Sequence, residues 1–293
     1  MRLCRFDNDR LGLLENDVVC DVTAATEVIE NRRWPLPPGD PLVANLAALT
    51  ERIKTLAPQS RRIPLRQVAL SSPITSPTKI MAAPANYRLH VEVDVKDPAI
   101  NAGEHLRQLE GVERPVEKLG LFLKASSSLI GPADGVRVIW PERRTDYEVE
   151  LVVVIGRQGR NIAAGDATAH VAGYCVGLDM TVRGVEDRSF RKSADSYTVV
   201  GPWLTTADEI ADPHKLTLWL TLNGRERQRS STAAMTVAIP RLIEIASAVY
   251  TLYPGDLLFT GTPEGVGAIA PGDTIVAGCE GLGEFAVAVR TLS

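Results

Sequence analysis

The stretch TDYEVELVVVIG, residues 145–156, joins three carboxylates to an apolar run. Asp146, Glu148 and Glu150 occupy alternating positions, and LVVVIG follows them. Because successive side chains of a β-strand point to opposite faces, a strand here would place all three acids on one face. The stretch therefore predicts a buried core strand with a cluster of negative charge at one end.

The segments around this stretch are rich in strand patterns and poor in helices. From residue 79 onward, apolar β-type segments such as KIMAAP, VAGYCVGLDMT, LTLWLTLNG and DLLFTGTP recur, most of them bounded by Gly, Pro or Asn-Gly. Helical spacing is clear in IPRLIEIASAVYTLY, residues 239–253, and AAGDATAHVAGY, residues 163–174, is a shorter candidate. This balance argues against a doubly wound α/β fold. It predicts a β-rich α+β protein with a mixed β-sandwich or β-roll core.

The chain is expected to divide near residue 72. Residues 1–72 combine a meander of short strands with a helical pattern in PLVANLAALTERIKTLA, which predicts a small N-terminal α+β domain. Residues 73–293 would form the larger, catalytic domain. Within it, residues 86–120 are polar and carry charges of both signs between two apolar strands. Such an insertion is either a lid over a site or a solvated surface excursion.

Composition excludes several classes of protein. The 293 residues carry a formal net charge of -4, and no basic stripe is present to neutralise the phosphates of a nucleic acid. No apolar run reaches the ~18–20 residues that span a membrane, and the N-terminal residues lack the apolar core of a secretory signal. Four scattered cysteines form no zinc-binding or disulfide pattern, so buried free thiols and a cytoplasmic location are expected.

The three acids raise the question of a metal ion. Like charges that share one face beside an apolar strand repel and lose hydration unless a cation offsets them. Oxygen ligands of this kind suit Mg²⁺, Mn²⁺ or Ca²⁺. A further carboxylate, Asp179, ends the apolar run VAGYCVGL, with Arg183 four residues later. From the residues alone, surface salt bridges and turn positions remain alternatives to a metal site.

Other groups with catalytic potential are fewer. His90 lies on the polar insertion with Glu92 close by, and a histidine near a carboxylate can act as a general base near neutral pH. The glycine-rich loop in LFTGTPEGVG offers hydroxyls and backbone amides to an anion, or serves only as a tight turn. Walker A, HExxH and GxSxG sequences are absent, and a proline follows GVGAIA where a nucleotide-binding helix would begin.

Together these stretches resemble the fumarylacetoacetate hydrolase family. The matching segments are ANYRLH, FLKASSSLIGP, DYEVELVVVIGRQGRNI, VAGYCVGLDMTVRGVEDRSFRKSADSYTVVGPWL, LNGRERQ and YPGDLLFTGTPEGVG, which run in order from about Lys79 to the C-terminus. The resemblance implies a β-roll core, assembly as a homodimer, and a small 2-oxo acid as the substrate. The first 70 or so residues resemble the variable N-terminal domain that many members carry.

The resemblance also implies a set of site residues. Glu148, Glu150 and Asp179 would hold Mg²⁺ or Mn²⁺, and Asp146 would lie outside the ligand set. Lys192 in RKSADS corresponds to the active-site lysine, and His90 with Glu92 would supply the proton-transfer groups. The substrate contacts that the resemblance implies are Tyr87, Arg183, Glu186 and Thr262.

Two positions depart from the family pattern. Val93 stands where many hydrolases of the family have a glutamate that pairs with the lid histidine, and Glu92 comes one residue early. Glu186 stands where glutamine is usual. Both positions affect which proton moves in the reaction. This sequence therefore defines the family better than it defines the reaction.

The expected reaction is metal-assisted hydrolysis of a C–C bond in an acylpyruvate-type 2,4-dioxo acid, which yields pyruvate and a carboxylic acid in the breakdown of aromatic compounds. In this scheme His90 deprotonates the attacking water, and Lys192 stabilises the enolate. Isomerisation of a 2-hydroxydienoate or decarboxylation of a 2-oxo acid is the alternative reaction. A protein that binds a carboxylate without turnover is the alternative to an enzyme.

Overall fold

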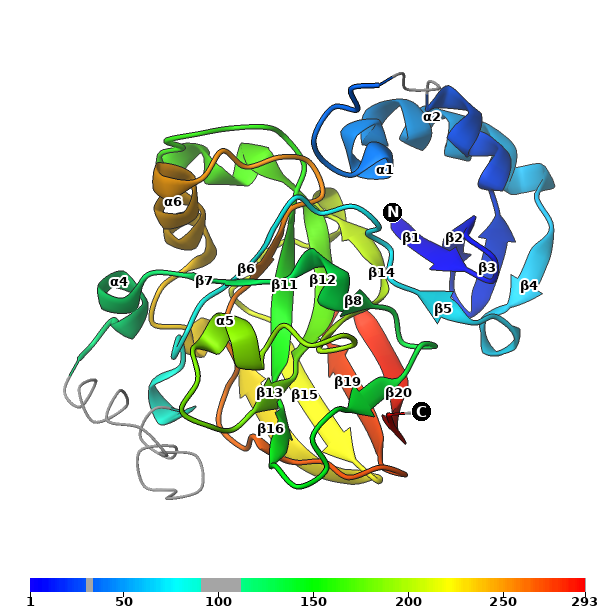
Figure 1. Cartoon of the computed structure of the whole chain (residues 1–293). Coiled ribbons are helices and arrows are strands. Elements are labelled where there is room, and N and C mark those ends of the chain that lie inside the picture. The colour runs from blue at the N-terminus through cyan, green and yellow to red at the C-terminus, as the bar shows by residue number, and fades with distance from the viewer. Residues whose placement is uncertain (30–33, 91–111, 293) are drawn as a thin grey trace.

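The computed structural model describes residues 1–29, 34–90 and 112–292 (Figure 1). Within these ranges the chain forms three β-sheets and a small number of short helices. The helices are α1 (Pro41–Ala44), α2 (Leu46–Leu56), α4 (Pro115–Leu119), α5 (Arg188–Arg191) and α6 (Ile239–Val249). The 3₁₀ helices are η1 (Thr23–Val28), η2 (Ala57–Gln59), η3 (Leu65–Gln67), η5 (Ser126–Ser128), η6 (Ala164–His170), η7 (Ala207–Glu209) and η8 (Thr232–Ala234).

The largest sheet runs through the whole molecule. In spatial order its strands are β4 (Arg62–Pro64), β3 (Val18–Asp21), β2 (Arg10–Glu15), β1 (Arg2–Phe6), β14 (Thr198–Thr206), β12 (Val171–Asp179), β11 (Val149–Ile155), β17 (Leu257–Phe259), β6 (Ile80–Ala82) and β7 (Phe122–Lys124). Two short strands join beside this path, β5 (Leu70–Ser71) on β1 and β8 (Leu129–Ile130) on β14. The sheet mixes antiparallel and parallel pairs, the latter at β17–β6 and β14–β8.

Two smaller sheets complete the architecture. One contains β16 (Arg225–Ser231), β15 (Thr217–Leu222), β19 (Thr274–Cys279), β20 (Gly283–Thr291) and β9 (Val136–Val138). The other contains β13 (Thr181–Val182), β10 (Thr145–Tyr147) and β18 (Gly267–Ala268). The β-rich α+β class and the mixed β-sandwich or β-roll core expected from the sequence are confirmed.

Strand β11 is buried on both faces. Val149, Leu151 and Val153 point into the main core, toward β15, where the five-stranded sheet packs. Val152 and Val154 point the other way, into a cluster that includes Val43 of α1. The run LVVVI is apolar because neither face of this strand meets water, which makes β11 a rigid support for residues at its end.

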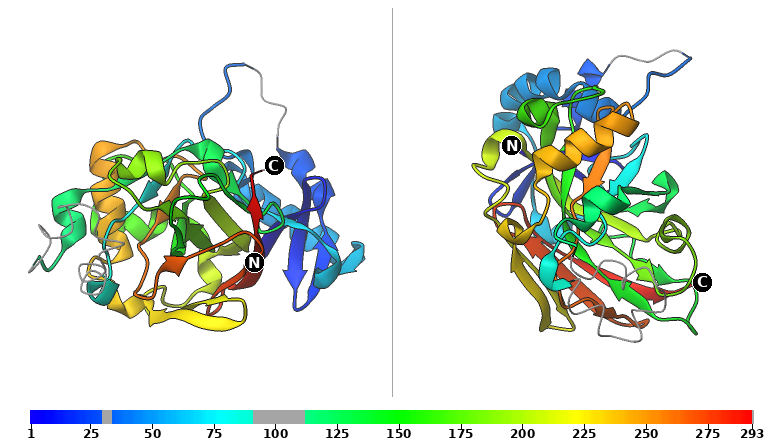
Figure 2. Two further views of the ribbon diagram at one scale, coloured as in Figure 1. Left: turned by 60° about the horizontal axis from the view of Figure 1, so that its bottom comes forward. Right: turned by 90° about the vertical axis from the view of Figure 1, so that its left-hand side faces the viewer.

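The N-terminal residues continue the large sheet. Strand β1 pairs with β14 in antiparallel register, Leu3 opposite Leu204. Figures 1 and 2 show these blue elements at one end of the molecule, with α2 covering their strands. A separate apolar cluster, which includes Leu49 and Ile53 of α2, fills the space beneath the helix. The division near residue 72 stays a prediction.

Helix prediction succeeded for one segment and failed for another. Helix α6 begins at Ile239, as the pattern indicates, and ends at Val249. The segment of residues 163–174 is not a regular α-helix: η6 covers Ala164–His170, and β12 begins at Val171. The pairing of β12 with both β11 and β14 outweighs the weak local helical preference of this segment. No described helix is long and apolar enough to cross a membrane.

Candidate metal centre and active site

The acidic stretch crosses from one sheet to another at Glu148. Strand β10 ends at Tyr147 and pairs with β13 and β18, whereas β11 begins at Val149 and pairs with β12 and β17. Glu148 therefore occupies the corner, where its carbonyl oxygen accepts a 2.9 Å hydrogen bond from the backbone N–H of Asp179 at the end of β12. This bond holds Asp179 beside the two glutamates.

Glu148, Glu150 and Asp179 form a buried carboxylate cluster. Each offers one oxygen, and these oxygens lie within 4.8 Å of one another. The exposed fractions of the three residues are 5%, 2% and 1%. Three buried oxygen donors at this separation fit a hard divalent cation such as Mg²⁺ or Mn²⁺.

The charges of the two glutamates are balanced differently. Burial works to raise the pKa of Glu148, but the positive charges of Lys192 and Arg183 outweigh it and hold that pKa well below its usual range. The pKa of Glu150 is raised well above its usual value by burial and by the negative charges of Asp179 and Glu148. Glu150 forms no ion pair with any residue in the described ranges and accepts a 2.6 Å bond from the Gly261 N–H. It is the group that most needs an added cation.

Two buried lysines reach the cluster. Lys192 Nζ donates to Glu148 Oε2 at 2.8 Å and to Asp179 Oδ2 at 2.7 Å. Lys124 Nζ binds the other oxygen of Asp179 together with the carbonyl oxygens of Lys192 and Tyr197. Burial lowers the pKa of Lys124, and the charge of Asp179 opposes that shift.

Asp146 holds an arginine against the cluster. Its carboxylate is fully buried and accepts hydrogen bonds from Arg144 Nε at 2.7 Å and from Arg183 Nε at 2.8 Å. Arg183 Nη2 lies 3.4 Å from Glu148 Oε1. Asp146 lies outside the cluster of possible ligands and fixes the guanidinium of Arg183 beside it.

Residues 86–90 bring a histidine to the same place. Asn86 is fully buried, and its amide donates to the carbonyls of Val237 and Thr260 and accepts from the N–H of Val237. Four residues later, burial lowers the pKa of His90 to about 4; Glu148 opposes this shift, and Arg183 and Lys192 add to it. His90 is therefore uncharged at neutral pH and within electrostatic range of the carboxylate cluster.

Tyr87 and Thr262, both expected to contact substrate, are buried. The hydroxyl of Tyr87 has no hydrogen-bond partner among the described residues, and its pKa is raised by burial and by the charge of Glu150. The hydroxyl of Thr262 donates to the carbonyl of Val149 and accepts from Gln228 Nε2, both at 2.9 Å. Thr262 thus ties its loop to β11 with its side chain.

Glu186 lies farther out than the cluster. Its two carboxylate oxygens form a bidentate pair with Arg143 at 2.9 Å and 2.8 Å, near the surface. The Arg143 guanidinium holds the pKa of Glu186 below its usual value. Glu92 and Val93 lie outside the described residues, as does most of the insertion proposed as a lid.

Sequence reasoning missed three residues that shape the site. Lys124, Gln228 and Asn86 are buried polar residues within otherwise ordinary segments. Lys124 gave one usable signal, since a lysine at the end of the apolar strand FLK needs a buried partner. Gln228 gave none, because β16 is polar along most of its length and only the fold buries this one position.

Comparisons with known proteins identify relatives of the chain. The family described as fumarylacetoacetate (FAA) hydrolase C-terminal matches residues 95–290. The chain is 47% identical over 292 residues to a maleylpyruvate hydrolase of Aquipseudomonas alcaligenes, covering 100% of both chains. It is 37% identical to an oxaloacetate tautomerase of Rattus norvegicus over 75% of this chain and 66% of that protein.

One solved structure is similar to this chain along its full length. The crystal structure of maleylpyruvate hydrolase from Sphingobium sp. SYK-6 in complex with manganese(II) and pyruvate superposes with a TM-score of 0.82. The two chains are 38% identical, and the match covers 100% of each.

Proposed function

The chain belongs to the fumarylacetoacetate hydrolase family, and from that premise we propose that it is a divalent-metal-dependent hydrolase of an acylpyruvate-type 2,4-dioxo acid. It cleaves the C–C bond between the acyl and pyruvate parts and releases pyruvate and a carboxylic acid. A maleylpyruvate-like acid from the breakdown of aromatic compounds is the proposed substrate. The observation that carries the proposal is the buried cluster of Glu148, Glu150 and Asp179, in a chain related along its full length to a maleylpyruvate hydrolase.

The carboxylate cluster is the proposed binding site for Mg²⁺ or Mn²⁺. When bound, such a cation polarises the 2-oxo group of the substrate and offsets the charge of the pyruvate enolate. Glu150 supports the assignment because it is buried among like charges without an ion-pairing partner in the described chain. Lys192 keeps its hydrogen bonds to Glu148 and Asp179 and places a second positive charge next to the enolate oxygen.

His90 is the proposed general base. An uncharged imidazole has a lone pair that can accept the proton of the attacking water, and burial keeps His90 uncharged at neutral pH. Its place beside Glu148, Arg183 and Lys192 supports the role. Glu92 is the proposed partner of His90 in this proton transfer.

The carboxylate at the pyruvate end of the substrate is assigned to the part of the site that contains Arg183 and Tyr87. Arg183 is held by Asp146 within reach of the cluster, and Tyr87 offers a buried hydroxyl near Glu150. Glu186 and Thr262 complete the proposed substrate site, Thr262 through the loop that it anchors and Glu186 through its pair with Arg143. We further propose a homodimer in the cytoplasm that has no nucleic-acid partner.

Isomerisation or decarboxylation of a related 2-oxo acid is the second candidate. The relation to an oxaloacetate tautomerase supports it, since keto–enol exchange uses the same enolate without an activated water. The two candidates differ in whether a C–C bond is hydrolysed.

A panel of 2,4-dioxo acids separates the two reactions. With Mn²⁺, the hydrolase releases one pyruvate and one carboxylic acid from maleylpyruvate, detected by lactate dehydrogenase coupling and by NMR. Enol–keto exchange of oxaloacetate without any pyruvate from the 2,4-dioxo acids would replace the hydrolase proposal with the isomerase.

A further inference from the structure

Helix α5 presents two arginines beside the metal centre. The helix covers Arg188–Arg191 and packs against β7 (Figure 1). Arg188 and Arg191 are three positions apart and therefore lie on the same side of this short helix. Both are partly buried, and the charge of Glu148 acts on the pKa of each.

Neither arginine has a carboxylate partner in the described chain. Arg191 donates from Nε to the carbonyl of Glu186 at 3.2 Å and from Nη1 to the carbonyl of Val182 at 3.3 Å, so its guanidinium is held by neutral groups. The Arg188 guanidinium makes no hydrogen bond or ion pair with any described residue. The neighbouring Asp187 uses its carboxylate to cap the helix at the Ser189 N–H. Burial is the largest influence on the pKa of both arginines and lowers it.

The site as a whole carries excess positive charge. Its carboxylates are Asp146, Glu148, Glu150, Asp179 and Asp187, and its cationic side chains are Lys124, Arg144, Arg183, Arg188, Arg191 and Lys192. Arg183 and Arg144 are neutralised in part by Asp146, and the lysines by Glu148 and Asp179. The charge of Asp187 acts on Arg188, but its carboxylate caps the helix, so the arginines of α5 are the cations of the site that form no ion pair with a described carboxylate. An anion with a second negative group, at some distance from the metal centre, matches this distribution.

We propose that Arg188 binds the distal carboxylate of the substrate and that Arg191 reinforces it, so that α5 selects 2-oxo acids with a carboxylate at both ends. This inference rests on the proposed function for the reactive end of the substrate. A maleylpyruvate-like acid has such a second carboxylate, whereas acetylpyruvate does not. The open guanidinium of Arg188 supplies paired N–H donors that suit a carboxylate.

Two unreactive ligands of equal length test the selection directly. 2-Oxoheptanedioate and 2-oxoheptanoate share the 2-oxo acid end and seven carbons, and only the first has a distal carboxylate. Binding to the Mn²⁺-loaded protein is measured by isothermal titration calorimetry. We expect the wild type to prefer the dicarboxylate by roughly tenfold or more, the value of one charged hydrogen bond.

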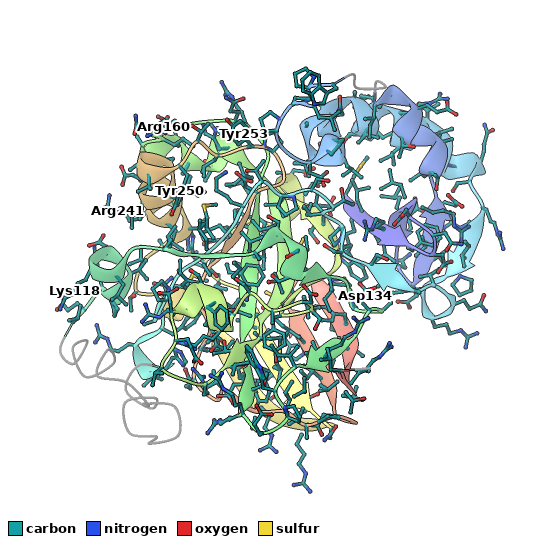
Figure 3. All side chains as sticks on the ribbon, in the orientation of Figure 1. Lys118, Asp134, Arg160, Arg241, Tyr250 and Tyr253 are labelled. Atoms are coloured by element: carbon teal, nitrogen blue, oxygen red, sulfur yellow. The ribbon has the colours of Figure 1, made fainter. Side chains whose placement is uncertain are left out.

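Substitutions then assign the preference to α5. Arg188→Gln is expected to reduce the preference to less than about threefold, with Mn²⁺ affinity and affinity for 2-oxoheptanoate unchanged. Arg188→Lys keeps part of the preference and covers the case in which Arg188→Gln does not fold. Arg160→Gln is the matched control, because Arg160 is exposed near Tyr253 and far from α5 (Figure 3).

The outcomes separate this inference from the proposed function. Equal affinity of the wild type for the two ligands, or an unchanged preference in Arg188→Gln, overturns the role of Arg188 even if maleylpyruvate is hydrolysed. A preference that depends on Arg188, in a protein that releases no pyruvate from any 2,4-dioxo acid, upholds the inference and overturns the hydrolase proposal.

Discussion

Glu148 and Glu150 are two residues apart in one segment, yet their charges have different surroundings. Glu148 accepts hydrogen bonds from Lys192 and from the Thr181 hydroxyl, and it forms an ion pair with the Arg183 guanidinium. Glu150 receives one backbone N–H, from Gly261, and faces two other carboxylates. The metal-free cluster is therefore stabilised at Glu148 and strained at Glu150.

Replacing each glutamate by glutamine distinguishes these surroundings. Glu148→Gln should lower the free energy of unfolding of the metal-free protein by about 3–5 kcal/mol, because it leaves buried cations without their partner. Glu150→Gln should leave that free energy unchanged or raise it, because it removes like-charge repulsion. Thermal melts in EDTA measure the difference.

The same melts with Mn²⁺ test the ligand assignment. The wild type should gain about 2.7 kcal/mol when Mn²⁺ is 100 times its Kd. Both variants should lose this gain. Full stabilisation of Glu150→Gln by Mn²⁺ would remove Glu150 from the ligand set.

His90 is predicted to act in turnover and not in metal binding. His90→Ala should lower kcat for a 2,4-dioxo acid by roughly 10²–10⁴-fold, the usual contribution of a general base. Mn²⁺ affinity should not change. Arg88→Ala, two residues earlier and exposed, is the control and should retain full turnover. A fully active His90→Ala would make Glu92 and Glu104, two acids of the polar insertion at residues 86–120, the next candidates for the base.

At the scale of elements, the loop after β17 extends the support of β11. Strand β17 pairs with β11 only at Val152–Val154. Beyond that point the loop bonds to this segment through two hydroxyls and two amides. The hydroxyl and the N–H of Thr260 both donate to Leu151 O, the Gly261 N–H donates to the Glu150 carboxylate, and the Thr262 hydroxyl donates to Val149 O. The sequence TGTP thus holds the segment of β11 that carries Glu150 where the sheet itself stops.

Gly261 is the residue of this loop that tolerates least change. Its φ is +97°, and an added Cβ would lie 2.7 Å from the Cβ of Asn86. Gly261→Ala should move the amide away from Glu150 and weaken Mn²⁺ binding by about 10–100-fold, as loss of a supporting contact does at metal sites. Gly224→Ala is the control, because φ is +76° there but no atom lies within 4 Å of the added Cβ. Equal Mn²⁺ affinity in the two variants would show that the amide does not support Glu150.

At the scale of the whole molecule, Glu148 and Glu150 form a site only because the fold brings residues from distant segments next to them. Asp179 comes from β12, Lys124 from β7 and Lys192 from the end of α5, and these meet because β11 lies near the middle of the large sheet. The four cysteines, three on the large sheet and Cys279 on β19 of the five-stranded sheet, are all buried and free, as the sequence predicted. The structure thus places reactive polar groups at one end of β11 and leaves the interior inert.

The reactivity of the four buried thiols tests the packing of the sheets. Burial raises the pKa of Cys4 and of Cys279 to about 12 and raises the pKa of Cys20 and Cys175. Since the thiolate is the reactive form, the folded protein at pH 8 should react slowly with iodoacetamide at all four positions. In guanidinium chloride all four should react, as counted by mass spectrometry. Rapid stoichiometric labelling of the native protein would contradict this packing.

Prediction from sequence went furthest where the signal was local. Alternating acids beside an apolar run indicated the core strand β11 and two of the three carboxylates of the cluster, because those twelve residues contain both the buried run and the charges. The prediction of a single strand with all three acids on one face was wrong, because the chain passes to another sheet at Glu148 and Asp146 belongs to β10. Asp179 was noted at the end of its own apolar run, but only the resemblance joined Asp179 and Lys192 to the two glutamates, because no local rule pairs residues about 30 and 40 positions downstream with β11. Lys124 and Gln228 were missed because their burial is decided by strands far away in the sequence.

Manganese titration of the metal-free protein tests the central claim most directly. Pyruvate release from maleylpyruvate is followed as Mn²⁺ is added to EDTA-treated wild type and to Glu150→Gln. We predict that the rate rises from near zero to a plateau as one Mn²⁺ binds per chain, and that the variant stays near zero while remaining folded. Undiminished pyruvate release in EDTA, or equal rates in the two proteins, would contradict a catalytic metal held by Glu148, Glu150 and Asp179.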